Sequence, residues 1–256
     1  MEGEKKLKRI LKLLPFLLIF SLFFSTSGLA KNENAKESLV ALGDSIPFGF
    51  GLTDSIDEPS RDAFPYLIGK KADLRVRNLA FPGWKTTDLL NALEYDQKFI
   101  QAVSKADYLT VNIGSNDLLK PIKDAYVASG GNLDEATIKY VIESQIAPNI
   151  LSFQQNITSI IGKIRILNPN AKIVLYDFYN PFLALGSLHP INKYGDPLIQ
   201  SINQSLKNLQ TPQLVIADAY VIGLNPVNNL IPGDIHPSIT GHELLADIGY
   251  SALGID

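Results

Sequence analysis

The 256-residue chain has no cysteine and only three histidines. Without cysteine, neither a disulfide nor a lipid-modified thiol can form, and cysteine-based zinc sites are excluded. Three scattered histidines make a poor metal site, and the His-Glu-x-x-His pattern of zinc enzymes is missing. We therefore expect no bound metal, and the folded chain must rely on its hydrophobic core for stability.

Two further classes of motif are missing. The chain has no Gly-x-Ser-x-Gly elbow, which excludes serine enzymes of the α/β-hydrolase type. Gly49 and Gly51 lack the third glycine of a dinucleotide fingerprint, and Gly69-Lys70-Lys71 lacks the remaining residues of a P-loop. Nucleotide-binding enzymes built on either motif are therefore excluded.

A long apolar run is missing as well. The most apolar segment, residues 13–24, has about a dozen residues and contains Pro15, whereas a membrane-spanning helix needs about 20. It follows five basic residues and precedes Gly28 and Ala30, which are spaced like a signal cleavage site. We expect residues 1–30 to be a removed signal peptide, with a retained membrane anchor as the alternative. Residues 31–256 would then form one secreted or cell-surface domain without a stable membrane span.

Basic residues are few after residue 30. This part holds 18 Lys and Arg against 24 Asp and Glu, a net charge of −6, and it contains no basic run. An acidic chain of this kind is a poor partner for nucleic acid or an anionic membrane surface. Its roughly 226 residues are within the range for a single α/β domain, and we expect a monomer.

Short apolar runs alternate with segments of helical period along the chain. The strand candidates are dense in Val, Ile and Leu and lie between turn residues, at 39–43, 76–80, 108–113, 173–177 and 214–217. The helix candidates lie at 63–72, 87–103, 149–167, 197–208 and 239–253. This alternation predicts a three-layer α/β/α sandwich with a five-stranded parallel sheet and right-handed crossovers.

Residues 117–148 interrupt the alternation. The segment is too long for a simple crossover, and residues 122–146 have helical character with a break at Ser129-Gly130-Gly131. We interpret it as an inserted helical hairpin over the carboxyl ends of the strands, where it would shape the substrate entrance. A surface insertion without such a role is the alternative.

Polar loops follow the predicted strands. In an open parallel sheet, ligands bind outside the carboxyl ends of the strands. Four loops lie at this end or just before the last helix: Gly43-Asp44-Ser45, Phe81-Pro82-Gly83-Trp84, Gly114-Ser115-Asn116-Asp117 and Gly233-Asp234-Ile235-His236. We expect these loops to converge on one site.

Ser45 and His236 are the residues best suited to nucleophilic chemistry. A serine hydroxyl is a weak nucleophile until a base within hydrogen-bond reach takes its proton, and histidine has a suitable pKa. His236 lies in a loop at the expected end of the sheet with a carboxylate nearby, whereas His189 and His242 suit packing or surface roles. The alternative for Ser45 is that it only caps a turn.

An acyl-transfer site also needs hydrogen-bond donors for the oxyanion of its tetrahedral intermediate. The backbone amides of Ser45 and Gly83 and the side-chain amide of Asn116 could supply three of them. Loss of one such donor typically costs about 10² to 10³ in rate.

Taken together, four blocks resemble the GDSL, or SGNH, family of serine esterases and lipases. The matching blocks are Gly43-Asp44-Ser45 with Gly49 and Gly51, Gly83 after Asn78-Leu79-Ala80-Phe81-Pro82, Gly114-Ser115-Asn116-Asp117, and Asp234-Ile235-His236-Pro237. The resemblance implies a flavodoxin-like sandwich with Ser45 as nucleophile and His236 as base. It also implies an oxyanion hole of Ser45, Gly83 and Asn116, and no metal or organic cofactor.

One position departs from the family pattern. The family usually places its acid three residues before the histidine, where this chain has Gly233, and Asp234 lies two residues before. Because side chains two apart on an extended segment point the same way, Asp234 could still orient His236. Alternatively, a backbone carbonyl of residues 231–233 accepts the Nδ1 proton and leaves a Ser-His dyad.

These observations favour a secreted serine esterase or lipase. It would hydrolyse a short-chain acyl ester or a lysophospholipid through an acyl-enzyme on Ser45, so that its partner is a small-molecule or lipid ester. Residues 177–182 are similar to a Tyr-Asn-Pro-Phe stretch in bacterial lipases and acylhydrolases, which favours a lipid ester over the alternative, an O-acetylated carbohydrate. A non-catalytic binding protein on the same fold is the second alternative, although such a protein would be expected to have lost part of the site.

Aromatic residues gather in the loops around the predicted site. They are Phe48, Phe50, Phe81, Trp84, Tyr179 and Phe182. We expect them to form an apolar acyl or aryl pocket, with core packing beneath the loops as the alternative for each.

Overall fold

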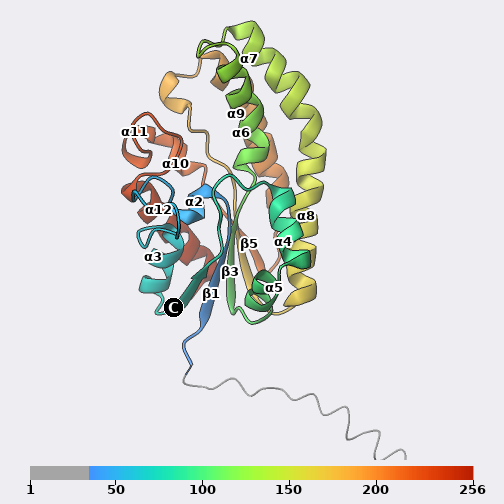
Figure 1. Ribbon diagram of the computed structural model, residues 1–256, viewed down its shortest axis with the longest axis vertical. Coiled ribbons are helices and arrows are strands. Elements are labelled where there is room, and N and C mark those ends of the chain that lie inside the picture. The colour runs from blue at the N-terminus through green and yellow to red at the C-terminus, as the bar shows by residue number, and fades with distance from the viewer. Residues whose placement is uncertain (1–34, 256) are drawn as a thin grey trace, which may run out of the picture. The chain divides into compact units, whose positions relative to one another are not determined.

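Five parallel strands form the centre of the fold (Figure 1). The structure is a computed structural model that describes residues 35–255, so the expected signal peptide lies outside the described residues. The strands are β1 (Ser38–Gly43), β2 (Arg75–Asn78), β3 (Tyr108–Asn112), β4 (Lys172–Tyr176) and β5 (Leu214–Ala217). Their order is β2-β1-β3-β4-β5, and every neighbouring pair is parallel. The expected five-stranded parallel sheet is confirmed.

Burial explains which strands are most apolar. The central strands β1, β3 and β4 are buried along nearly their whole length, as expected for strands covered on both faces. Strand β2 lies at one edge, and its alternating half-buried and exposed residues include Arg75 and Arg77. The edge position therefore accommodates charged side chains that a central strand would exclude.

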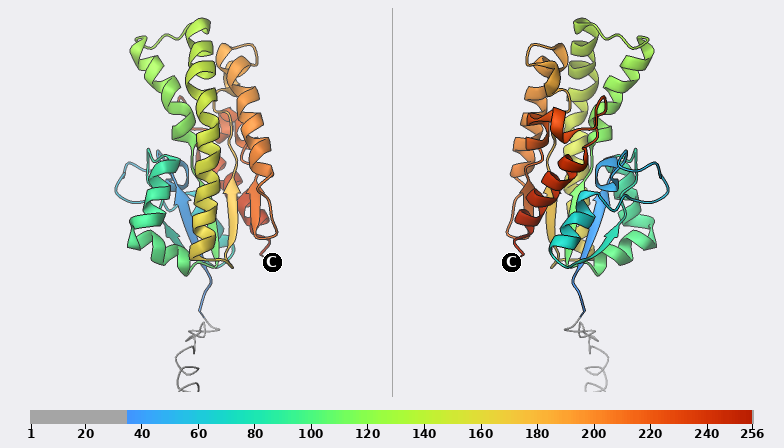
Figure 2. Two further views of the ribbon diagram at one scale, coloured as in Figure 1. Left: turned by 90° about the vertical axis from the view of Figure 1, so that its right-hand side faces the viewer. Right: turned by 90° about the vertical axis from the view of Figure 1, so that its left-hand side faces the viewer.

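Helices cover both faces of the sheet (Figure 2). One face carries α4 (Thr86–Tyr95), α5 (Gln97–Ser104) and α8 (Ile150–Leu167), which pack on the larger hydrophobic cluster. The other carries α3 (Phe64–Lys71) and α12 (Ile239–Leu253), with the short α10 (Val221–Leu224) and α11 (Pro226–Asn229) nearby. The expected three-layer α/β/α arrangement is confirmed. Within residues 35–255, no helix is both long and apolar enough to cross a bilayer.

Two predicted helices differ from those observed. The single helix expected at 87–103 is divided into α4 and α5 at Asp96, whose Oδ1 accepts the Lys98 backbone N–H at 2.7 Å and so caps α5. The helix expected from Pro197 is α9 (Pro190–Lys207), which begins seven residues earlier behind a His189 cap. Proline suits the first turn of a helix, and both Pro190 and Pro197 carry that signal.

Two residues separate the end of β3 from the helical segment that follows it. Helix α6 (Ser115–Ala128) begins two residues before the expected insertion of residues 117–148 and seven residues before its expected helical part, and a turn with Gly130 and Gly131 at positive φ connects it to α7 (Glu135–Val141). A π-helical turn (Ile142–Ile146) and a 3₁₀ turn (Ala147–Asn149) continue into α8. Buried isoleucines and a valine pack α6, α7 and α9 together as a third hydrophobic cluster: Ile122, Ile138, Val141, Ile142, Ile146 and Ile191.

Candidate active site

Ser45 lies at the end of β1, on a turn that only glycine permits. Gly43 has φ +155°, and a Cβ atom there would lie 1.9 Å from the backbone oxygen of Asn112 on β3. Asp44 then caps the one-turn helix α2 (Ser45–Phe48), because its Oδ1 accepts the Ile46 N–H at 3.1 Å. Ser45 is thus the first residue of a helix, where backbone N–H groups have no intrahelical partner.

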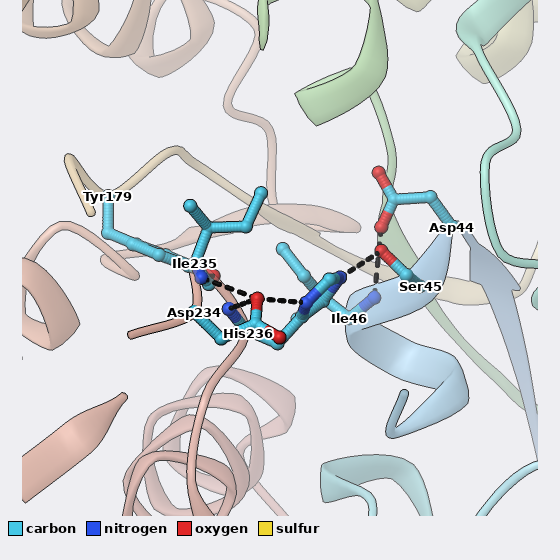
Figure 3. Close-up of polar contacts among 7 residues, drawn as sticks. All are labelled: Asp44, Ser45, Ile46, Tyr179, Asp234, Ile235 and His236. Atoms are coloured by element: carbon cyan, nitrogen blue, oxygen red, sulfur yellow. Dashed lines mark hydrogen bonds and ion pairs between the residues drawn. The ribbon is translucent and has the colours of Figure 1, made fainter. Parts of the chain in front are cut away.

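The side chains of Ser45, His236 and Asp234, which are far apart in the sequence, lie side by side (Figure 3). The Nε2 atom of His236 lies 2.9 Å from Ser45 Oγ, and its Nδ1 lies 2.7 Å from Asp234 Oδ1. Asp234 Oδ1 also accepts the backbone N–H groups of Ile235 and His236, at 2.6 and 3.2 Å. The structure therefore places the carboxylate of Asp234, rather than a carbonyl of residues 231–233, at Nδ1 of His236.

The ionisation of Asp234 is favoured by these contacts. Partial burial raises the pKa of this carboxyl, but the hydrogen bonds and charge of His236 and the two backbone N–H groups outweigh burial and hold the pKa below its usual value. An ionised Asp234 can fix the imidazole orientation and stabilise a positive charge on it.

The loop that carries His236 is held by two aromatic residues. The Tyr179 hydroxyl donates to the Ile235 backbone oxygen at 2.7 Å, which ties the loop after β4 to the histidine loop. The Phe50 ring lies 5.0 Å from the His236 ring, centroid to centroid. Both contacts hold the histidine loop beside Ser45, and the sequence indicated Tyr179 only as part of an aromatic set.

The predicted oxyanion donors lie around the same cavity. Ser45, Gly83, Asn116 and His236 all line it. The Asn116 side-chain amide donates one N–H to the Trp84 backbone oxygen at 2.9 Å, which ties α6 to the loop that carries Gly83. An amide nitrogen has two N–H groups, so this contact fixes the side chain while leaving a second donor.

Comparison with known proteins agrees with this geometry. The sequence model of the GDSL-like lipase/acylhydrolase family matches residues 41–244. The chain belongs to this family. It is therefore a carboxylic-ester hydrolase, as the four sequence blocks predicted.

Individual proteins are similar to this chain in sequence or in structure. The uncharacterized protein YpmR of Bacillus subtilis (strain 168) is 27% identical over 238 residues, which cover 88% of this chain and 85% of YpmR. The crystal structure of the lipase Lip_vut3 from a goat rumen metagenome is 25% identical with a TM-score of 0.65, covering 85% of this chain and 97% of that one. Phospholipase A1 from Streptomyces albidoflavus NA297 has the same fold, with 18% identity, a TM-score of 0.68, and coverage of 85% and 100%.

Two buried carboxyls near the site were not anticipated from the sequence. Asp44, directly before Ser45, is fully buried, and burial raises its pKa to about 7 against opposing hydrogen bonds from Ile46 and Ser115. Asp177, at the end of β4, lines the cavity, and burial together with nearby Asp218 raises its pKa to about 7. The residue types were visible in the sequence, but their burial depends on tertiary packing.

The remaining histidines have structural contacts. His189 caps α9, because its Nδ1 accepts the Ile191 N–H at 3.3 Å, and it also lines the cavity. His242 is fully buried in α12, where its Nδ1 accepts the Phe64 N–H at 3.2 Å and its ring stacks on that of Phe64. Burial, with a smaller effect of His236, lowers the pKa of His242 to about 3.

This shift predicts how His242 affects stability with pH. Below pH about 6.5, His242 is protonated in the unfolded chain but not in the folded chain. The free energy of unfolding therefore decreases as the pH is lowered from about 6.5 to about 3. The His242→Asn variant keeps a hydrogen-bond acceptor but has no group that titrates here. As the pH is lowered, the free energy of unfolding of the wild type should decrease relative to this variant by up to about 1.4 kcal/mol per pH unit. Urea unfolding of both proteins across this range measures the difference, and a difference independent of pH would contradict a neutral buried histidine.

A cavity of about 1040 Å³ opens beside Ser45. Of the six aromatic residues expected to line it, three do: Phe50, Tyr179 and Phe182. The other three are placed differently, because Phe48 is buried in the core, Trp84 stacks on Phe99 and Phe81 is 57% exposed.

Within residues 35–255, no group of three or more acidic or histidine side chains could hold a metal ion.

Proposed function

We propose that the protein is a serine esterase that cleaves lipid-type carboxylic esters through an acyl-enzyme on Ser45. The observation that carries the proposal is the continuous chain from Ser45 Oγ to His236 Nε2 at 2.9 Å and from His236 Nδ1 to Asp234 Oδ1 at 2.7 Å. A nucleophile, a base and an orienting acid in hydrogen-bond contact are the arrangement that activates a serine hydroxyl.

The first half-reaction follows from these contacts. Nε2 of His236 takes the hydroxyl proton as Ser45 Oγ attacks the ester carbonyl carbon, and Asp234 stabilises the resulting imidazolium. The carbonyl oxygen becomes an oxyanion, which would accept hydrogen bonds from the N–H groups of Ser45, Gly83 and Asn116, three residues that line the cavity. Collapse of the intermediate breaks the bond to the alcohol, which leaves with the proton from Nε2.

The second half-reaction repeats these steps with water. Nε2 of His236 takes a proton from water as the hydroxide attacks the acyl carbon, and collapse of the second intermediate returns the proton to Ser45 Oγ. The products are a carboxylic acid and the free serine, and no cofactor takes part.

Two observations favour a lipid-type ester over an O-acetylated carbohydrate. The cavity beside Ser45 is lined by many aliphatic and aromatic side chains, which suit an acyl chain better than a sugar. A family member of similar structure, 25% identical, is a lipase.

The signal-like character of residues 1–30 supports action outside the cytoplasm.

Labelling with a fluorophosphonate tests the proposed nucleophile. Because only an activated serine reacts with such a probe, we expect one adduct per folded molecule, located on Ser45 by peptide mass spectrometry. The protein denatured before labelling is the control and should remain unlabelled. A folded protein that acquires no label would instead indicate a non-catalytic binding protein on this fold.

A further inference from the structure

The cavity beside Ser45 extends along α6, away from the sheet. Its lining includes Asn116, Leu119, Ile122 and Tyr126, which are spaced three or four residues apart and therefore share one face of the helix. Asn116 lies at the Ser45 end, and Tyr126 lies near the end of α6. The cavity thus runs from the reacting serine along most of this helix.

The opposite wall comes from elements far apart in the sequence. It includes Leu133 and Ile138 from the α6–α7 region, Phe182 from the loop after β4, and Ile191 and Ile199 from α9. Most of these side chains belong to, or pack against, the third hydrophobic cluster. Lys123 and Asp124 lie at exposed positions of the lining, and the buried Asp177 lies at the carboxyl end of β4. Between these positions the wall is largely apolar.

From this geometry we infer that the α6 cavity binds a linear acyl chain of medium to long length. This inference rests on the proposed function, because it places the acyl carbon at Ser45. From Asn116 to Tyr126 the helix rises about 15 Å, which equals the extended length of roughly twelve carbons joined by 1.5 Å bonds. A cavity of about 1040 Å³ is at the upper end of the range for small-molecule sites and is larger than an acetyl or butyryl group requires.

Leu119 provides the most direct test of the inference. It lines the cavity, is half-buried, and is in none of the three hydrophobic clusters of the described residues. Its side chain therefore faces the cavity rather than the core, and a larger or polar residue there should narrow or polarise the acyl site without opening the core. Tyr140 on α7 is 61% exposed and outside the cavity lining, so it is a matched control position.

The experiment uses p-nitrophenyl acetate, butyrate, octanoate, laurate and palmitate with the full protein. In the wild type, kcat/KM should rise with chain length up to laurate, by up to about fourfold per buried CH₂ group, and then level off. Leu119→Trp should lower the laurate-to-butyrate ratio of kcat/KM by up to about 16-fold, since it displaces about two CH₂ groups. Tyr140→Trp should leave the ratio unchanged. If the tryptophan variant does not fold, Leu119→Asp is the substitute test. It places a charge in the site at a half-exposed position and should also lower the ratio.

The outcomes separate this inference from the proposed function. Reaction of Ser45 with a fluorophosphonate, combined with a wild-type kcat/KM that falls from butyrate to laurate, would overturn the acyl site and leave the serine esterase intact. An unchanged ratio in both folded Leu119 variants would overturn it as well. Failure of Ser45 to react would remove the proposed function, and the acyl site with it.

Discussion

Replacing Ser45 with alanine is expected to reduce kcat for ester hydrolysis by about 10⁴ to 10⁶. The Oγ atom that lies 2.9 Å from His236 Nε2 is the only atom of this residue able to form the acyl bond. Without it, catalysis is limited to attack by water assisted by the oxyanion donors, which typically retains only a small residual rate. Initial rates with p-nitrophenyl butyrate measure the loss.

Two controls make the result specific to the hydroxyl. Ser201→Ala changes an exposed serine on α9 and should retain full activity. Thermal unfolding of Ser45→Ala should match the wild type, because the change removes one oxygen at the cavity wall. Wild-type rates in the Ser45→Ala protein would mean that another residue is the nucleophile.

Replacing Asp234 with asparagine is expected to reduce kcat by about 10² to 10⁴ while leaving measurable activity. An asparagine can present its N–H to His236 Nδ1 and favour the imidazole tautomer that cannot take the serine proton. The Asp234 side chain is 39% exposed, and solvent screens the interaction of exposed charges. We therefore expect a smaller loss than the full loss at Ser45. The pH dependence of kcat in the wild type and the variant measures the change.

The Asp234 series also decides between a triad and a dyad. If a backbone carbonyl of residues 231–233 orients the imidazole, both Asp234→Asn and Asp234→Ala should hydrolyse esters at nearly the wild-type rate. A loss as large as that of Ser45→Ala in both variants would rule out the dyad. Asp247→Asn, which breaks only an exposed ion pair with Lys71, is the matched control and should hydrolyse esters at the wild-type rate.

Local patterns in the sequence predicted most of the fold. Short apolar runs between turn residues placed all five strands to within two residues at every boundary. The central strands were the clearest, because a strand buried on both faces must be apolar throughout, whereas the edge strand β2 carries Arg75 and Arg77. The break between α4 and α5 was missed, because the apolar period of residues 87–103 continues through Asp96 and only its capping contact ends one helix and begins the next. The start of α9 was misplaced for a related reason, since two prolines compete for it.

The predicted site residues were visible because acyl transfer requires particular residue types at strand ends. Gly43, Ser45, Gly83, Asn116 and His236 could be selected from four loops without coordinates, and the structure brings these loops around one cavity. The position of Asp234 could not be decided from spacing alone, because both an aspartate two residues away and a backbone carbonyl can reach an imidazole nitrogen. The observed 2.7 Å contact depends on how the turn of residues 231–236 folds.

The sequence by itself therefore determined the strand and helix order, the family and the side chains that can carry ester chemistry, since each depends on local periodicity or on residue type. Only the tertiary structure decided the burial of Asp44 and Asp177, the three aromatic residues that face the cavity, and the length of that cavity. These features depend on contacts between α6, α7, α9 and the loop after β4, which are distant in sequence. Side-chain packing determines such contacts, and a local sequence pattern cannot predict that packing.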